Sequence, residues 1–314
     1  MALTRPQRIS AGPSPERPDE HVVPDGQGGE RLDRYAITVL PGLATRTHAK
    51  NATKRGELRV NGEERPPNYR VKPGDRLVFT GAPRPPPPIY AVPIEVPWED
   101  DHMAVVVKPP GLVVSGNRHR SLEHALLPHL APSAEPDALP WPRPVHRLDL
   151  RTGGLVMVAK TARTRALLGD VLKARSASKR YRAVLLGRLE GSGTVDLPVD
   201  GRASLSRYEV VQHCRSLRTD WLTTVNLWPV TGRTHQLRQH MAHLGHPVLG
   251  DEVYGTQGCI LRGMGLFLWS LELELVHPIT GDPLRVCIPE PPKYESLRQR
   301  EARRWLKYRE PDSS

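Results

Sequence analysis

The sequence predicts an α+β protein in which a small N-terminal unit precedes a larger unit built mainly on β-sheet. Three observations lead to this prediction. The chain has 314 residues, about twice the length of a typical domain. A proline-rich stretch, residues 82–92, separates two regions of different character. Beyond it, apolar runs typical of strands follow one another without the regular strand and helix alternation of a doubly wound fold.

Composition narrows the possible functions. The chain carries 45 Lys and Arg against 34 Asp and Glu, a net charge of +11, which favours a polyanionic partner and nucleic acid first. No apolar run approaches the roughly 18 residues that a membrane helix needs, so we expect no membrane span. The three cysteines, Cys214, Cys259 and Cys287, form no C-x-x-C pair. They indicate a reducing compartment, and we expect the protein in the cytoplasm.

Residues 1–27 are rich in proline, glycine and charge and lack an apolar face. Such a segment cannot bury enough surface to offset the entropy lost on ordering. It also lacks the apolar centre of a secretory signal. We therefore expect a disordered leader.

Residues 28–81 predict two helices followed by short strands. The first helix lies within residues 31–42 and ends at a Pro-Gly pair, and the second lies within residues 45–56 and ends at a glycine. Turn sequences at Asn61-Gly62 and at residues 72–75 then bound two strands. Residues 31–90 hold twelve basic side chains against five carboxylates, so much of the excess positive charge lies here.

Residues 82–92 contain four consecutive prolines, which enforce an extended and semi-rigid polyproline II conformation. A ligand for an SH3-type domain is the alternative interpretation. Their place between two ordered units favours a domain linker.

Residues 93–292 form the predicted larger unit, and residues 293–314 form a basic helical tail. Apolar runs, one of them with clean alternation, predict the strands of this unit. Strands are expected at residues 103–107, 154–159, 181–187, 271–276 and 284–288, and helices at 161–174 and 235–245.

Asp149 is the first candidate for chemistry. It lies in a short polar loop before the predicted strand 154–159, after His146 and Arg147. A loop held by a rigid strand is a common way to present a carboxylate to a substrate. Taken alone, however, such an aspartate is more often a turn cap or the partner of an arginine.

The second candidate segment, residues 229–255, begins with a turn that leads into a helix. Arg233 lies in this turn, where its guanidinium could pair with a carboxylate from another loop. Four histidines follow, which suggest a metal site, but their spacing matches no common ligand pattern. We therefore favour structural roles for them and expect no metal; they are His235, His240, His243 and His246.

The third candidate is Tyr181, which opens a predicted strand among Lys179, Arg180 and Arg182. An aromatic face among cations is a typical way to stack an exposed base while phosphates are neutralised. The alternative is an ordinary core tyrosine. A further segment, residues 108–111, has the sequence KPPG and predicts a rigid structural turn after a buried strand.

Taken together and in order, these segments resemble the RluA family of pseudouridine synthases. The matching motifs are DHMAVVVKPPGLVV, HRLD followed by TGGLVMVAKT, KRYRA, and TGRTHQLRQHMAHLGHPVLGD. The N-terminal unit resembles the S4 RNA-binding module through its second helix, the GELRVNG end and the VKPGD turn. One segment departs from the family pattern: Leu268-Trp269-Ser270 stands where many members have Leu-His-Ala. We expect a change of packing or RNA contact near the cleft.

The resemblance implies a mixed, mainly antiparallel catalytic sheet preceded by a small S4-like domain. It also implies roles for single residues. Asp149 corresponds to the catalytic aspartate, Arg233 to the arginine that forms a salt bridge with it, and Tyr181 to the aromatic side chain that stacks on the target base. Arg147 corresponds to the arginine that fills the space left by the flipped nucleotide. Further RNA contacts are expected from His146, Arg46, Lys50, Lys54 and Arg55.

The expected function is therefore RNA pseudouridine synthase, with large-subunit ribosomal RNA the first substrate class and transfer RNA the second. The isomerisation needs no cofactor because nothing is oxidised and no phosphoryl group moves. A carboxylate can attack C1′ of the ribose or remove the C2′ proton, and the sequence leaves both routes open. Two alternatives remain: a non-catalytic RNA-binding assembly factor and a metal-dependent hydrolase using the histidines. We expect a monomer without a protein partner.

Overall fold

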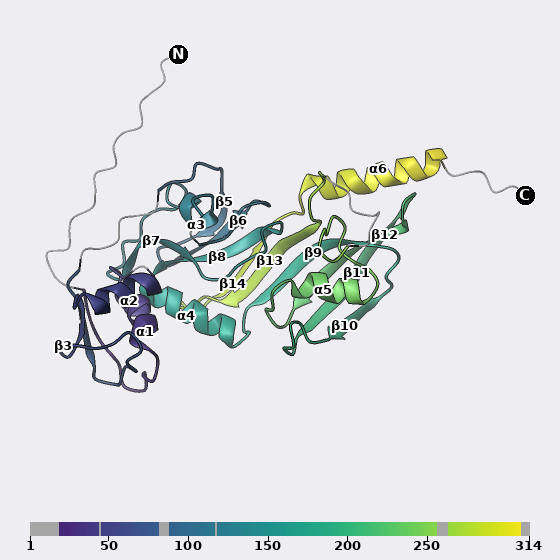
Figure 1. Ribbon diagram of the computed structural model, residues 1–314. Helices are drawn as coiled ribbons and strands as arrows, with labels where there is room; N and C mark the ends of the chain where they lie inside the picture. The colour runs from purple at the N-terminus through teal and green to yellow at the C-terminus, as the bar shows by residue number, and fades with distance from the viewer. Residues whose placement is uncertain (1–18, 44, 82–87, 117, 256–262, 309–314) are drawn as a thin grey trace, which may run out of the picture. The chain divides into compact units, whose positions relative to one another are not determined.

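The computed structural model describes residues 19–43, 45–81, 88–116, 118–255 and 263–308 (Figure 1). The chain divides into two compact units, residues 1–85 and 86–314. Part of the predicted linker, residues 82–87, lies outside the described residues.

The N-terminal unit packs two helices on a small antiparallel sheet with the strand order β1-β4-β2-β3. The hydroxyl of Thr45 caps α2 by accepting a hydrogen bond from the backbone N–H of His48. Leu32, Leu58 and Leu77 are fully buried between the helices and the sheet. The elements are β1 (Asp19–Val22), α1 (Leu32–Val39), α2 (Arg46–Lys54), β2 (Leu58–Val60), β3 (Glu63–Glu64) and β4 (Arg76–Phe79).

The predicted disordered leader is wrong over its last residues. Strand β1 pairs with β4, and the following Val23 is buried in the core of the unit. The short strand has no apolar alternation of its own, and it is ordered by a partner more than fifty residues further along the chain. Residues 1–18 lie outside the described residues.

The larger unit is built on a ten-stranded sheet in which eight strands follow the order β10-β11-β12-β9-β13-β8-β6-β5. Strand β14 pairs with β13, and β7 pairs with β8. In the described part of the chain, β13 and β8 pair in parallel and the other neighbours are antiparallel. The strands are β5 (Glu95–Glu99), β6 (Met103–Lys108), β7 (Ala138–Pro144), β8 (Gly153–Thr161), β9 (Ser178–Leu186), β10 (Ser192–Asp196), β11 (Leu205–Ser216), β12 (Asp220–Pro229), β13 (Leu268–Val276) and β14 (Pro283–Cys287).

This architecture confirms the predicted α+β class with a mainly antiparallel sheet. The helices are α3 (Leu122–Ala125), α4 (Ala162–Lys173), α5 (Gln236–His243) and α6 (Pro292–Tyr308). None of the helices in the described ranges combines the length and the apolar character needed to cross a membrane.

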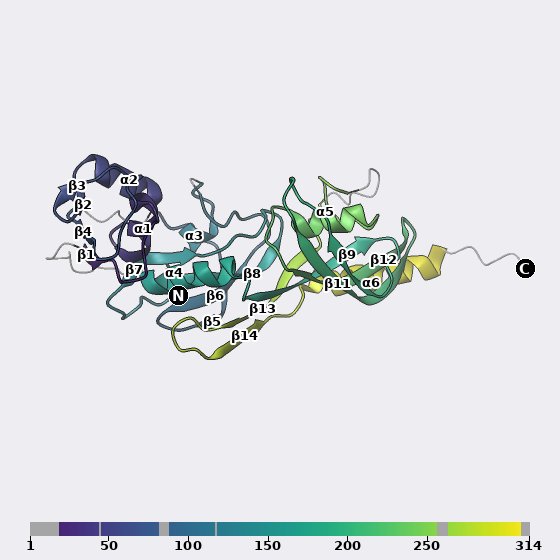
Figure 2. The ribbon, with the colours of Figure 1, turned by 90° about the horizontal axis from the view of Figure 1, so that it is seen from below.

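Helices α5 and α6 cover opposite faces of the sheet at β9 and β12, as Figures 1 and 2 together show. Alternate residues of β9 explain this arrangement, because side chains alternate between the faces of a strand. Ala183 and Leu185 belong to the core that includes Leu237 of α5. Val184 belongs to the core beneath α6, with Tyr294. The predicted basic tail is thus a docked helix, and the Ser216 hydroxyl of β11 donates to its buried Glu301 carboxylate.

Candidate active site

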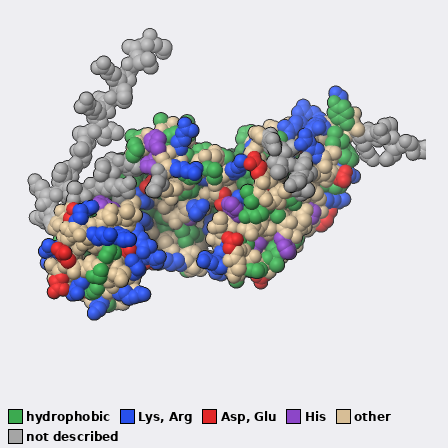
Figure 3. Space-filling view, in the orientation of Figure 1, with side chains coloured by type: hydrophobic (Ala, Val, Ile, Leu, Met, Phe, Trp, Pro, Cys, Tyr) green, Lys and Arg blue, Asp and Glu red, His purple; other side chains and the backbone are tan. Residues whose placement is uncertain are grey.

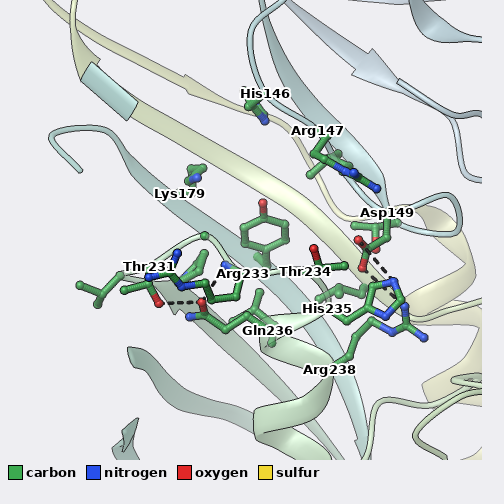
Figure 4. Close-up of a pocket in the computed structure, with 18 of the residues that line it drawn as sticks. His146, Arg147, Asp149, Lys179, Thr231, Arg233, Thr234, His235, Gln236 and Arg238 are labelled. Carbon is green, nitrogen blue, oxygen red and sulfur yellow. Dashed lines mark hydrogen bonds and ion pairs between the residues drawn. The ribbon is translucent and has the colours of Figure 1, made fainter. Parts of the chain in front are cut away.

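A cavity of about 340 Å³ opens in the larger unit (Figure 4). Its volume lies in the range of small-ligand sites. Three segments form its walls: the loop between β7 and β8, the residues from the end of α4 to the start of β9, and the turn that leads from β12 into α5. All three candidate segments of the sequence therefore meet at one place.

Asp149 lies in the first of these segments, in a turn that is anchored on both sides. The backbone N–H of Thr152 donates to its carbonyl oxygen at 3.1 Å, and Leu148 is buried in the core. The N–H of Gly111 donates to the carbonyl oxygen of Leu150 at 2.7 Å. The Asp149 side chain is 19% exposed and lines the cavity. A half-buried carboxylate is thus held at a fixed place in the cavity wall.

Lys108 supports this turn from within the protein. Its fully buried ammonium donates to the carbonyl oxygens of Leu112 at 2.7 Å and Leu150 at 3.3 Å. Burial lowers the pKa of Lys108 to about 8, although the negative charge of Asp149 acts in the opposite direction. The predicted structural turn at residues 108–111 therefore serves to position the Asp149 loop.

Two glycines allow β8 to approach β13 closely behind the loop. A Cβ on Gly154 would lie 2.2 Å from the carbonyl oxygen of Ser270, and the residue has φ +110°. A Cβ on Gly153 would lie 2.3 Å from the ring of Trp269. Trp269, which departs from the family pattern, thus packs behind the Asp149 loop, whereas its neighbour Leu268 lines the cavity. Of the two effects expected for this departure, the structure supports a change in packing.

Arg238 and His235 both approach the Asp149 carboxylate. The Arg238 Nη1 atom lies 3.5 Å from one carboxylate oxygen, and the His235 Nε2 atom lies 3.7 Å from the other. Arg238 is buried, and it also pairs with the buried Asp251 through two hydrogen bonds of 2.7 Å. Burial would raise the pKa of Asp251, but these hydrogen bonds and two backbone N–H groups outweigh it and lower the pKa.

The predicted ion pair between Asp149 and Arg233 is wrong. Figure 4 shows Arg233 directed away from Asp149, and its Nε atom donates to the carbonyl oxygen of Ala203. Gln236 explains this direction, because its side-chain oxygen accepts from the Arg233 N–H at 3.0 Å and from the Thr231 hydroxyl at 2.6 Å. Arg233 therefore belongs to a turn fastened to the start of α5, and Arg238 takes the predicted pairing role.

His235 holds an unusual backbone conformation between that turn and the helix. Its φ and ψ angles, 56° and 19°, lie in the left-handed region that non-glycine residues rarely adopt. Its ring Nδ1 lies 3.1 Å from the Tyr254 hydroxyl, while Nε2 faces Asp149. A strained residue next to a reactive group is typical of active sites.

Tyr181 lines the cavity from β9 and is 8% exposed. Burial raises the pKa of the Tyr181 hydroxyl, and the negative charge of Asp149 adds to the effect. The side chain is therefore neutral at physiological pH. From this place in the cavity wall, the aromatic ring of Tyr181 is suited to stack on a nucleobase.

Two further predicted RNA contacts, Arg147 and His146, also line the cavity. Arg147 is exposed and makes no side-chain hydrogen bond or ion pair with any residue in the described ranges. His146 instead uses its Nε2 atom to accept a hydrogen bond from the Met157 N–H at 3.0 Å. Burial, together with the charge of Lys179, lowers the pKa of His146 to about 3. His146 therefore brings no positive charge to RNA at neutral pH.

The histidines that follow Arg233 do not converge on one point. His240 lies within 3.0 Å of the Ser204 hydroxyl, and His246 bonds the carbonyl oxygen of Leu186. Within the described ranges, no group of three or more histidine, cysteine or acidic residues is arranged to hold a metal ion.

The four predicted RNA contacts of the N-terminal unit divide into two pairs. Arg46 donates to the buried Asp33 carboxylate at 3.0 Å, and Arg55 forms two hydrogen bonds with Glu57. Lys50 and Lys54, in contrast, are exposed on α2 without a partner in the described part of the chain. Figure 3 shows Lys and Arg side chains over much of the visible face of this unit.

The larger unit thus combines a mainly antiparallel sheet with a cationic cavity whose described lining includes an aromatic wall and a single carboxylate. Comparison with known proteins specifies the class. Residues 102–243 match the family described as RNA pseudouridylate synthase. The ribosomal large subunit pseudouridine synthase D of Xanthomonas campestris is 33% identical, with 88% of this chain and 90% of that protein covered. The chain belongs to this family and is an RNA pseudouridine synthase, an isomerase.

Other similar proteins agree with this assignment. The ribosomal large subunit pseudouridine synthase D of Pseudomonas aeruginosa is 34% identical, with 86% of this chain and 91% of that protein covered. Among solved structures, human RNA pseudouridylate synthase domain containing 1 superposes with a TM-score of 0.54 and 26% identity, covering 63% of this chain and 84% of that one. Human RNA pseudouridylate synthase domain containing 4, at 21% identity and a TM-score of 0.52, covers 67% and 93% and supports the fold.

Proposed function

We propose that the protein isomerises uridines of large-subunit ribosomal RNA to pseudouridine, with Asp149 as the catalytic carboxylate. The observation that carries the role of Asp149 is its position: it is half-buried in a cationic cavity, within 3.5 Å of Arg238, and shares that cavity with Tyr181. The printed names of the bacterial relatives support the choice of ribosomal RNA.

The chemistry requires few groups. The N1–C1′ bond of uridine breaks, the uracil turns, and C5 bonds to C1′ while the C5 proton is lost and N1 gains a proton. Asp149 can serve by attacking C1′ or by removing the C2′ proton. In both routes the reacting form is the carboxylate anion, and the Arg238 guanidinium lies 3.5 Å from one of its oxygens.

The target uridine must leave the RNA stack to reach this cavity. Extrusion of a base costs a few kcal/mol, and stacking on an aromatic side chain returns about 1–3 kcal/mol. Tyr181 supplies the stacking surface. The guanidinium of Arg147, which has no partner among the described residues, is available to occupy the space that the uridine leaves.

The N-terminal unit, in this proposal, is an S4-like module that increases the affinity for RNA. Its exposed Lys50 and Lys54 lie on one helix, and long-range attraction of phosphates by such cations is independent of sequence. The proposed place of action is the cytoplasm and the proposed active form is the monomer.

Removing the charges of the exposed Lys50 and Lys54 should weaken RNA binding without affecting folding. We expect the K50Q/K54Q variant to bind a fluorescein-labelled RNA hairpin several-fold more weakly, with a smaller dependence of log Kd on log salt. Its thermal midpoint should stay unchanged. R46Q is the contrasting variant, because it removes a hydrogen-bond donor from the buried Asp33 and should cost about 1 kcal/mol of stability. Equal hairpin affinity in K50Q/K54Q and wild type would contradict the RNA-binding role.

Pseudouridine mapping tests the proposed substrate. Total RNA from a strain that lacks the gene should be compared with RNA from the wild-type strain and from a complemented strain. We expect one or more pseudouridines of the large-subunit ribosomal RNA to disappear and to return on complementation. Loss of sites only in transfer RNA would assign the other substrate class, and an unchanged map would contradict the proposal.

A further inference from the structure

The wall of the cavity carries more positive charge than the Asp149 carboxylate needs. Arg238, which pairs with Asp149, is already shared with Asp251. Four other cations also line the cavity, and Asp149 is the one carboxylate among its described lining residues. These four are Arg147, Arg175, Lys179 and Arg233.

Lys179 is one of two cations in this wall to which neither the fold nor the proposed function has so far given a role. It lies two residues before Tyr181 on β9, so both side chains project from the same face of the strand and line the cavity. The cations on the opposite face, Arg180 and Arg182, are matched by the carboxylates of Glu272 and Glu290. The fold thus neutralises the arginines of this strand but not its lysine.

The position of Lys179 in the cavity wall is also energetically unfavourable for its charged form. Figure 4 shows it on the other side of the cavity from Asp149. It is half-buried, and its ammonium makes no hydrogen bond or ion pair with a residue in the described ranges. Burial lowers the pKa of Lys179. A partly desolvated cation without a partner is costly, and an anionic ligand would remove that cost.

Arg175 is the second of these two cations, and its backbone is strained. It follows α4 at the position where the chain turns left-handed, with φ 58°. The N–H of Ser176 donates to the carbonyl oxygen of Val171 and the N–H of Arg175 to that of Leu172, the hydrogen bonds of a Schellman motif. Glycine is favoured at this position because it has no Cβ. Arg175 thus occupies this position despite its backbone strain, and its exposed side chain lines the cavity. This combination indicates a role other than stabilising the fold.

We propose that Arg175 and Lys179 form a subsite for a backbone phosphate of the bound RNA, next to the extruded uridine. This inference rests on the proposed function for the identity of the bound RNA. A guanidinium matches a phosphate through two parallel hydrogen bonds, and an ammonium adds a point charge. Arg175 at the exposed rim and Lys179 further inside would fix the register of the RNA strand relative to Asp149.

The test uses the R175Q and R175G variants of the full-length protein. The matched control is R163Q, which removes an equal charge from the exposed first turn of the same helix, outside the cavity. Binding of a fluorescein-labelled oligouridylate is measured by anisotropy over a range of KCl concentrations. We expect both Arg175 variants to bind about 3- to 10-fold more weakly at low salt, with the slope of log Kd against log salt reduced by about 0.7, the value for one phosphate contact. R163Q should bind like the wild type.

Thermal unfolding separates this role from a structural one. Because glycine relieves the left-handed strain, R175G should unfold at a temperature no lower than the wild type while it binds RNA less well. A lower midpoint with unchanged affinity would assign Arg175 a structural role and overturn the proposal.

Kinetics on ribosomal RNA from a strain lacking the gene give a third measurement. We expect R175G and K179Q to raise KM with little change in kcat, because a phosphate contact holds substrate and transition state equally. A fall in kcat with KM and Kd unchanged would overturn the phosphate subsite and assign the cations to the reacting base. If wild-type protein forms no pseudouridine in this RNA, the proposed substrate fails, and the binding measurements still decide the subsite.

Discussion

The D149N variant should form pseudouridine at least about 10³-fold more slowly than the wild type, because an amide neither attacks C1′ nor accepts the C2′ proton. The change adds no bulk and leaves the turn hydrogen bond from Thr152 to the backbone carbonyl in place. Arg238 retains its two hydrogen bonds to Asp251. The variant should therefore fold normally and bind RNA within a few-fold of the wild type.

Two measurements check this prediction. Pseudouridine formation is followed in ribosomal RNA from a strain lacking the gene, and RNA affinity is measured by anisotropy. E252Q is the matched control, because Glu252 is an exposed carboxylate paired with Arg151 outside the cavity, and such surface pairs contribute at most about 1 kcal/mol. More than residual turnover by D149N would contradict the catalytic role, and equal losses in D149N and E252Q would indicate a general effect of lost charge.

Much of the fold could be predicted from the sequence where local signals are strong. The runs that form β6, β8, β9, β13 and β14 were identified, because contiguous or alternating apolar residues are typical of strands. The long pair β11 and β12 was not. Strand β11 has a mixed polar sequence, half exposed, and its order depends on pairing with β10 and β12. Such strands are defined by their neighbours in space, which a local pattern does not contain.

The site was predicted less completely, for a reason that lies at the start of α5. Arg233 and Arg238 are only five residues apart, and both suit a carboxylate chemically. The left-handed conformation of His235 and the hydrogen bonds of Gln236 turn Arg233 away, while Arg238 lies on the buried face of the helix. One signal was available: an arginine on the apolar face of a helix requires an internal carboxylate. Arg238 lies on the same face of the helix as Leu237 and Met241. The sequence therefore indicated that Arg238 pairs with a buried carboxylate.

Replacing Arg238 should have the largest combined effect on activity and stability. In R238K a single ammonium replaces the planar guanidinium that contacts both Asp149 and Asp251. The ammonium cannot hold the two carboxylates in their observed geometry. We expect kcat/KM to fall by about 10²-fold or more. Wild-type kcat/KM in R238K would contradict the positioning of Asp149 by Arg238.

The R238M variant should in addition lose about 3–5 kcal/mol of stability at neutral pH, because it leaves the fully buried Asp251 carboxylate without its charged partner. The pH dependence of this loss has a definite sign. In the wild type the pKa of Asp251 is lowered, so its stabilising effect is present above the unfolded-state pKa of about 4 and is lost as the pH falls through the lowered folded-state value. Without Arg238, two backbone N–H groups still hydrogen-bond the Asp251 carboxylate, and we expect burial to outweigh them and to raise the folded-state pKa above the unfolded value.

The folded R238M protein would then bind a proton that the unfolded chain does not hold, so its stability should rise as the pH falls from 8 to 5. Urea unfolding of both proteins at these two pH values measures the difference. We expect the deficit of R238M relative to wild type to be clearly smaller at pH 5. An equal deficit at both values would show that lost packing of the arginine side chain, rather than an unpaired buried carboxylate, accounts for the instability.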